Sequence, residues 1–169
     1  MNRDTLLHIG RFILLILAQV LVLNHINFLG DLNPYIYIIF ILLAPLNINK
    51  SLFLFISFIL GLTLDIFGDS GGVHAAACLV IAFFRPVALR TVFGLSYEFQ
   101  TVKLSNIGFG EKLAYVTLMV LTHHIVLFSL EIFNFSHILL IVKKTLFSSL
   151  FTIIVTMLVL VLFRRTSDS

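Results

Sequence analysis

The stretch GLTLDIFGDSGGVHAAA, residues 61–77, holds two aspartates, a histidine and four glycines in a chain that is otherwise mostly apolar. Long apolar runs lie on both sides of it, and its centre, residues 68–72, is rich in glycine. Glycine adopts the backbone angles that a tight reversal needs. Helices joined by a short connection are antiparallel neighbours. The stretch therefore predicts a helical hairpin whose turn brings Asp65 close to His74.

The composition of the chain indicates the solvent in which this hairpin folds. Of its 169 residues, 60% are hydrophobic and 11% are charged, against about 25% charged residues in average soluble proteins. The apolar runs lack the alternation of a membrane β-barrel, so helices must satisfy the backbone in lipid. We predict an all-α, polytopic integral membrane protein. Its net charge of +3 is small, and the basic residues flank apolar runs, which favours contact with the lipid bilayer over nucleic acid.

Six apolar segments approach the length of about 20 residues that a perpendicular membrane helix needs. We predict that they form one compact bundle, a single domain over residues 1–165, followed by a disordered tail at 166–169. The predicted helices lie near residues 9–28, 34–49, 51–67, 72–92, 113–133 and 138–163. The second and third are short, and Arg85-Pro86 interrupts the fourth, since a residue before proline is biased out of helix. An alternative makes the third and fourth helices a re-entrant pair.

The basic residues orient these six helices, because positively charged loops stay in the cytoplasm. With a cytoplasmic N-terminus, the residues that fall inside are Arg3, Arg11, Lys50, Arg85, Arg90, Lys103, Lys112, Arg164 and Arg165, and only Lys143 and Lys144 fall outside. Adding or removing one helix would destroy this separation. We therefore predict six crossings with both termini in the cytoplasm.

Motifs that carry catalytic chemistry are missing from the sequence. There is no GxxxxGK[ST] phosphate loop, no HExxH, no GxSxG and no CxxC. His123 and His124 are adjacent, and neighbours on a helix do not share a face on which to hold one metal ion. We predict instead that each of them, like Gln19, hydrogen-bonds to a neighbouring helix. The sequence thus predicts no catalytic residue, no metal ligand, no cofactor and no enzymatic activity.

A polar stripe runs along the last predicted helix, where Lys144, Ser148, Thr152 and Thr156 follow one another at intervals of four residues. Such a spacing places them on one slowly drifting face. Small hydroxyl-bearing residues let helix backbones approach and form hydrogen bonds between helices. The stripe predicts either packing within this chain or a seam for the transmembrane helix of a partner.

Asp65 lies about 21 Å along its helix, in the outer part of a hydrocarbon core about 30 Å thick. An ionised aspartate at that depth needs a buried partner or access to water. Gly61, four residues earlier, is on the same face and allows another helix to approach closely. Asp69 or Ser70 is predicted to cap the following helix. The stretch is interpreted either as a structural hydrogen bond that fixes the hairpin or as a proton or ligand site.

The ordered set of these features resembles the MreD family of bacterial rod-shape-determining membrane proteins. The features are Gln19 late in the first apolar run, Pro34 and Ala44-Pro45 at the two ends of the second, Gly61-Leu62-x-x-Asp65, the glycine loop 68–72 and Val73-His74. The likeness covers the first half of the chain, and the second half is similar in hydropathy. Members of this family are small, with about six helices and almost no extramembrane domain. The fold that this implies is also similar to the substrate-binding subunits of energy-coupling-factor vitamin transporters.

The resemblance implies a non-catalytic scaffold in the bacterial cytoplasmic membrane, within the machinery that builds the lateral cell wall and maintains rod shape. The implied partner is an MreC-like membrane protein, and through it MreB, RodA and the elongation transpeptidase. The candidate structural or partner-interface residues are Gln19, Pro34, Pro45, Gly61, Asp65, Gly68, Gly72, His74, Lys144, Ser148, Thr152 and Thr156.

The likeness to the transporter subunits supplies an alternative function, the binding of a small solute such as a vitamin. That function needs polar side chains that converge on an outer cavity. The sequence offers Gln19, Asn24, Asp65 and His74 for this purpose.

Overall fold

A computed structural model describes residues 3–26, 32–94 and 108–165 of the chain, and every regular element in these ranges is helical. The five long helices are α1 (Arg3–Leu21), α3 (Lys50–Gly68), α4 (Val73–Phe93), α5 (Phe109–Ile132) and α6 (Ile138–Arg165). Three short elements are η1 (Leu23–His25), α2 (Ile38–Leu42) and η3 (Phe135–His137). The predicted tail at 166–169 lies outside the described residues.

All five long helices lie in segments that are long and apolar enough to cross a membrane. Many of their large hydrophobic side chains point outward, among them Leu14, Phe83 and Leu139, which are 60%, 77% and 83% exposed. Exposure of this kind is expected where the surrounding solvent is lipid. The chain is therefore an all-α, multi-pass membrane protein.

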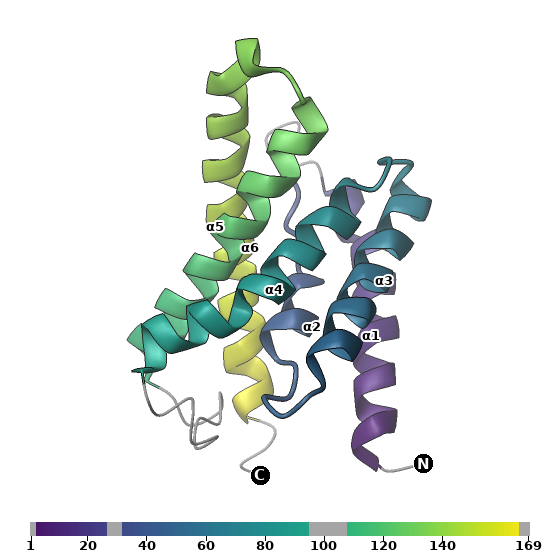
Figure 1. The fold of residues 1–169 in the computed structure, drawn as a ribbon, viewed down its shortest axis with the longest axis vertical. Coiled ribbons are helices and arrows are strands. Elements are labelled where there is room, and N and C mark those ends of the chain that lie inside the picture. Colours follow the sequence, from purple (N-terminus) through teal and green to yellow (C-terminus); the bar gives the residue numbers. More distant parts are fainter. Residues whose placement is uncertain (1–2, 27–31, 95–107, 166–169) are drawn as a thin grey trace.

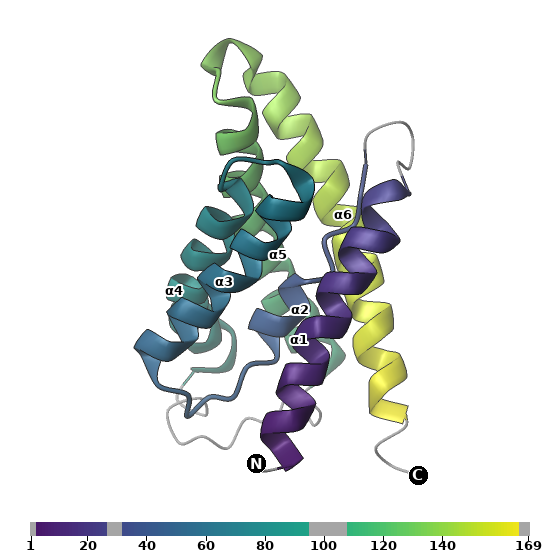
Figure 2. The same ribbon diagram turned by 90° about the vertical axis from the view of Figure 1, so that its right-hand side faces the viewer.

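Successive helices pack as antiparallel neighbours: α3 against α4, α4 against α5, and α5 against α6. α1 lies at the side of the bundle, and the hairpin of α5 and α6 extends beyond the turn between α3 and α4 (Figure 1). α1 begins and α6 ends at the same end of the bundle (Figures 1 and 2). Below, this end is called the terminal end, and the end that holds the α3–α4 turn is called the hairpin end.

The predicted second helix at 34–49 is wrong, and with it the expectation of six helices. Residues 32–49, here called the crossing segment, contain only the five-residue helix α2. The segment still passes from the hairpin end, beside η1, to the terminal end, where α3 begins (Figures 1 and 2). The chain thus joins the two ends of the bundle here without a long helix, and five helices are long and apolar enough to cross a membrane. Pro34 and Pro45 bracket a stretch too short for a spanning helix.

The alternative that made the third and fourth predicted helices a re-entrant pair is also wrong. The segment without a long helix is residues 32–49, which precede α3. α3 has 19 residues and α4 has 21, so both are long enough to span. α4 runs through Pro86, whose side chain is exposed. Arg85, which was expected in a cytoplasmic loop, is instead inside the bundle and only 4% exposed.

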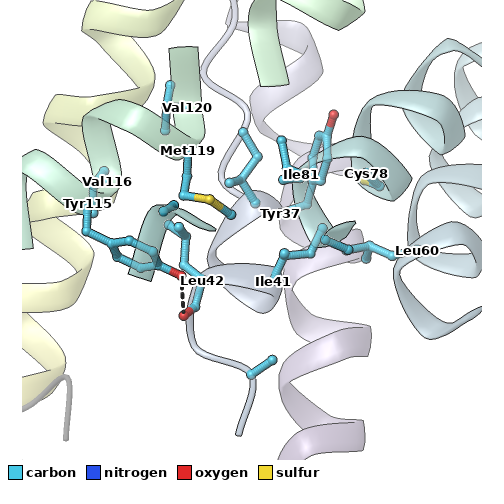
Figure 3. Close-up of a cluster of buried hydrophobic side chains, with 14 of the residues drawn as sticks. Tyr37, Ile41, Leu42, Leu60, Cys78, Ile81, Tyr115, Val116, Met119 and Val120 are labelled. Atoms are coloured by element: carbon cyan, nitrogen blue, oxygen red, sulfur yellow. Dashed lines mark hydrogen bonds between the residues drawn. The ribbon is translucent and has the colours of Figure 1, made fainter. Parts of the chain in front are cut away.

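The crossing segment forms the centre of the hydrophobic core. Tyr37, Ile38 and Ile41 are fully buried. Around them lie side chains from three long helices (Figure 3). These neighbours are Leu60 of α3, Cys78 and Ile81 of α4, and Tyr115, Val116, Met119 and Val120 of α5. Side chains of all five long helices pack in this core, and four of the five residues of α2 are buried.

Candidate functional site

Asp65 fixes the turn between α3 and α4 from inside the bundle. Its carboxylate is 5% exposed. Oδ1 accepts hydrogen bonds from the Ser70 hydroxyl at 2.5 Å and from the His74 backbone N–H at 3.0 Å, and Oδ2 accepts one from the Ala75 N–H at 2.8 Å. The first N–H groups of a helix have no partner in the helix, and their dipoles favour a negative charge. The carboxylate of α3 therefore caps α4.

This geometry corrects the predicted cap and identifies the type of bond that Asp65 makes. Gly72 occupies the position before α4, with φ of 95°, and no side chain of its own caps the helix. Asp69 is exposed and left-handed, with φ of 49°, and Ser70 donates to Asp65 instead of capping α4. These bonds support the interpretation of Asp65 as a structural residue that fixes the hairpin. Its partners in α4 are the backbone N–H groups of His74 and Ala75, and not the His74 ring.

Gly61 allows the two helices of the hairpin to touch. A Cβ added at this position would lie 2.5 Å from the Cα of Ala75 and closer still to the carbonyl oxygen of His74. Real side chains do not approach a backbone so closely, and glycine is required here for contact. The predicted close approach at Gly61 thus places the start of α4 within reach of the Asp65 carboxylate one helical turn later. Gly68, at the end of α3, has ordinary space around it.

The part of the crossing segment nearer the hairpin end is held by hydrogen bonds from α1 and α6. Gln19 of α1 donates to the Pro34 carbonyl at 3.0 Å and accepts from the Ile36 N–H at 3.0 Å. The same amide donates to Asn24 at 2.7 Å. The hydroxyl of Thr152, in α6, accepts from the Tyr35 N–H at 3.1 Å. Two side chains thus replace the bonds that a continuous helix would have made.

The part of the crossing segment nearer the terminal end is held by side chains of α4 and α5. Arg85 Nη2 donates to the carbonyl oxygens of Ala44 and Leu42, the latter at 3.5 Å. The Tyr115 hydroxyl donates to the Leu42 carbonyl at 3.3 Å (Figure 3). Arg85 Nε donates to the same hydroxyl at 3.2 Å. The guanidinium also lies over the Phe53 ring, 5.3 Å from its centre. Carbonyl dipoles and a ring face stabilise this buried cation.

These four side chains explain how an irregular segment lies at membrane depth. Lipid offers no hydrogen bonds, so such backbone is tolerated only where protein buries and satisfies it. Gln19 and Thr152 satisfy it at the hairpin end, and Arg85 and Tyr115 at the terminal end. Sequence reasoning singled out Gln19 and Thr152 but missed Arg85 and Tyr115. Two sequence features could have pointed to Arg85 and Tyr115. Each is a polar side chain inside an apolar helix, and the apolar segment at 34–49 is too short to span the membrane as a helix.

A cluster of aromatic and histidine rings joins the crossing segment to α4 and α5. Tyr35 packs edge-on against His74 and His124, with ring centres 5.9 and 5.1 Å apart. The Tyr37 hydroxyl lies 2.9 Å from His123 Nε2. His123 and His124 thus make the predicted contacts to neighbouring elements. His124 Nδ1 is 2.8 Å from the Val120 carbonyl, which only accepts, so in the neutral ring Nε2 accepts from the Thr152 hydroxyl at 3.3 Å.

The polar stripe of α6 faces the inside of the bundle. Ser148, Thr152 and Thr156 are at most 1% exposed. Lys144, the residue of the stripe nearest the start of α6, forms an ion pair with Glu131 of α5, with Nζ 3.0 Å from Oε1. The stripe thus packs within this chain, and a seam for another protein would need a face that is open.

Several of the predicted candidate residues lie at contacts between elements of this chain. Gln19 contacts Pro34 in the part of the crossing segment nearer the hairpin end, and Gly61, Asp65, Gly72 and His74 lie together at the α3–α4 turn. Pro45 follows the carbonyl that Arg85 binds and lines an apolar groove beside α1. Within the ranges that the structure describes, no three histidine, cysteine or acidic side chains are placed to hold a metal ion.

Comparison with models of known protein families, with curated proteins and with solved structures finds no match to this chain.

Proposed function

We propose that this chain is a non-catalytic scaffold of the MreD kind, which binds the membrane segment of an MreC-like protein in a cell-wall elongation complex. The observation that carries the proposal is that polar side chains of the long helices bind the chain's own backbone. Gln19, Asp65, Arg85 and Thr152 all hold the chain to itself through hydrogen bonds to its own backbone. Such an interior supports a rigid bundle, and among the described residues the long helices expose many large apolar side chains that a partner's membrane segment could contact.

The same observation weighs against the alternative of a solute-binding subunit. That function needs Gln19, Asn24, Asp65 and His74 to present free polar groups to one cavity. Gln19 instead forms hydrogen bonds to the backbone of the crossing segment, and Asp65 forms hydrogen bonds to the backbone of α4. Asn24 accepts from Gln19, and the His74 ring packs against two tyrosines. Three of the four candidates, Gln19, Asn24 and Asp65, already have hydrogen-bond partners within the chain, whereas His74 Nδ1 is buried without one among the described residues.

Partner recovery tests the proposal. The tagged chain is extracted from its host with a mild detergent and the co-purifying proteins are identified by mass spectrometry. An unrelated multi-pass protein with the same tag, expressed at the same level, is the control. We expect specific enrichment of a single-pass membrane protein of the MreC kind, followed at lower yield by RodA and the elongation transpeptidase. Recovery of the chain alone, or with only an ATPase module, would contradict the proposal.

Depletion of the chain gives an independent measurement. If the chain supports lateral wall synthesis, depleted rod-shaped cells should become wider and rounder within a few generations, and insertion of labelled wall precursor along the cell sides should fall. Re-expression of the wild-type chain should restore the rod shape. Unchanged shape and unchanged wall insertion would argue against the scaffold role.

A further inference from the structure

An apolar groove lies between α1 and α6 at the terminal end of the bundle. Its volume is about 510 Å³. α1 contributes Gly10, Arg11 and Leu14, α6 contributes Val159, and Leu43 of the crossing segment forms part of the floor. α2 lines the groove with Ile39 and ends at Leu42, just before Leu43.

The length of the groove matches one leaflet of a bilayer. Its α1 wall extends from Leu6 to Leu15, which is about 14 Å at 1.5 Å per residue, or roughly half of the hydrocarbon thickness. Beyond that point Leu15 is buried in a cluster with Ile36, against which Ala18 and Val155 pack, and this cluster closes the seam between α1 and α6. A transmembrane helix needs the full thickness of the bilayer, whereas the acyl chains of a lipid need one leaflet.

The charge at the groove selects among lipids. Arg11 lines the groove and is partly buried, and it forms no ion pair among the described residues. A long basic side chain lays its stem along apolar surface and carries its charge to the headgroup level. The sequence adds Arg3 near the start of α1 and Arg164 and Arg165 at the end of α6, the two helices that flank the groove. Basic side chains at a membrane surface attract anionic headgroups.

From this volume, depth and charge we infer that the α1–α6 groove binds one anionic phospholipid of the leaflet at the terminal end, with its acyl chains against Gly10, Leu14 and Leu43 and its phosphate at Arg11. This site is independent of the proposed scaffold function. Gly10 offers a direct way to block it, because a Cβ built there meets no atom within 4 Å. A larger side chain at this position would enter the groove without disturbing the bundle.

The test compares lipid retention in nanodiscs made of equal parts phosphatidylglycerol and phosphatidylcholine, read by native mass spectrometry. The wild-type chain should retain a phosphatidylglycerol molecule that Gly10→Leu loses. Arg11→Gln should lower the ratio of retained phosphatidylglycerol to phosphatidylcholine about fivefold, the factor that corresponds to about 1 kcal/mol per basic side chain. Equal retention by wild type and Gly10→Leu, or an unchanged ratio in Arg11→Gln, would overturn the inference.

Matched controls separate the groove from general membrane contact. Ile13→Phe adds volume to a lipid-facing position of α1 outside the groove, and Lys50→Gln removes an exposed charge at the same end of the bundle. Both variants should retain lipid like the wild type. A photoreactive benzoylphenylalanine at Leu14 then identifies the occupant in native membranes: a phospholipid adduct supports the inference, and an adduct with a polypeptide replaces it with a protein partner.

Discussion

At the scale of single residues, two neighbours on one face of α3 determine how the hairpin packs. Gly61 removes the side chain that would separate the helices, and Asp65 supplies acceptors for the exposed amides of α4. The two residues depend on each other, since the carboxylate reaches the amides only if the backbones touch. A short motif of glycine and aspartate, four residues apart, is thus explained by geometry without a ligand.

Replacement of Asp65 by alanine should destabilise the protein by about 1–3 kcal/mol, because buried N–H groups of His74 and Ala75 lose their acceptor. Asp65→Asn keeps one acceptor oxygen and should lose less. The fraction of monodisperse protein that remains after heating in detergent measures the effect. The control is Asp69→Asn, at an exposed left-handed position that asparagine tolerates. Wild-type stability of Asp65→Ala would contradict the capping role.

Substitution at Gly61 should be more damaging than its size suggests. Gly61→Ala adds one methyl group that meets the backbone of α4, so the helices must separate and the Asp65 bonds must lengthen. The same substitution at Gly10 meets open space and gains helix propensity of up to about 1 kcal/mol. In the heating assay Gly61→Ala should melt well below wild type and Gly10→Ala at or above it. Similar melting of the two variants would show that the close approach is unimportant.

At the scale of elements, the crossing segment is the part of the fold that differs most from a simple helical bundle. It has one turn and a half of helix, and several of its other polar backbone groups bond to side chains from four surrounding helices. Arg85 donates to two of its carbonyls and to the Tyr115 hydroxyl, and Gln19 binds one of its carbonyls and one of its N–H groups. Side chains of α1, α4, α5 and α6 therefore determine the position of α2.

Arg85→Met should lower the free energy of unfolding by about 2–3 kcal/mol, because it removes a charged donor from two buried carbonyls. Tyr115→Phe removes one weaker bond and should cost about 1 kcal/mol. Arg85 Nε also donates to the Tyr115 hydroxyl, and each single variant already breaks this bond, so the double variant should lose less than the sum of the two. Reversible unfolding in mixed detergent micelles measures the three values. Full additivity would contradict the coupling between Arg85 and Tyr115.

The sequence could predict the hairpin but not the crossing segment, for a physical reason. The glycine turn and Asp65 are local signals, because the partners that they need follow within ten residues. The bonds that hold residues 34–44 come from Gln19, Arg85, Tyr115 and Thr152, which are scattered over the chain. Hydropathy reports burial in lipid and burial in protein alike, so residues 34–49 resembled a spanning helix. Their short length and two prolines were the available warnings.

At the scale of the whole molecule, the path of the chain agrees with the charge distribution although the number of long helices does not. The predicted orientation requires residues 25 and 47 on opposite sides of the membrane, and the crossing segment joins the two ends of the bundle (Figures 1 and 2). Arg85 and Lys112 have to be removed from the set of loop charges, since both are buried. Among the other basic positions that the structure describes, Arg3, Arg11, Lys50, Arg90, Arg164 and Arg165 lie on helical segments at the terminal end, and Lys143 and Lys144 lie near the start of α6.

Cysteine labelling tests this topology with little background, because the native Cys78 is fully buried. Single cysteines replace His25, Asn47 and Asp69, all at exposed positions. An impermeant maleimide added to intact cells should label His25→Cys and Asp69→Cys, whereas Asn47→Cys should react only after the membrane is opened. Labelling of all three from outside would mean that residues 32–49 do not cross, and labelling of Asn47→Cys alone would reverse the orientation.

The bond between Tyr35 and Thr152 has a consequence for the order in which the chain is made. These residues are separated by 117 positions, and the acceptor lies in the last helix. During synthesis the early crossing segment leaves the ribosome long before the helices that satisfy its backbone, so it cannot settle alone in the hydrocarbon core. Its final placement has to wait until α6 has entered the membrane. Completion of the last helix thus closes the whole fold, and a chain truncated before Thr152 would present an unfinished interior to the proteases that survey the membrane.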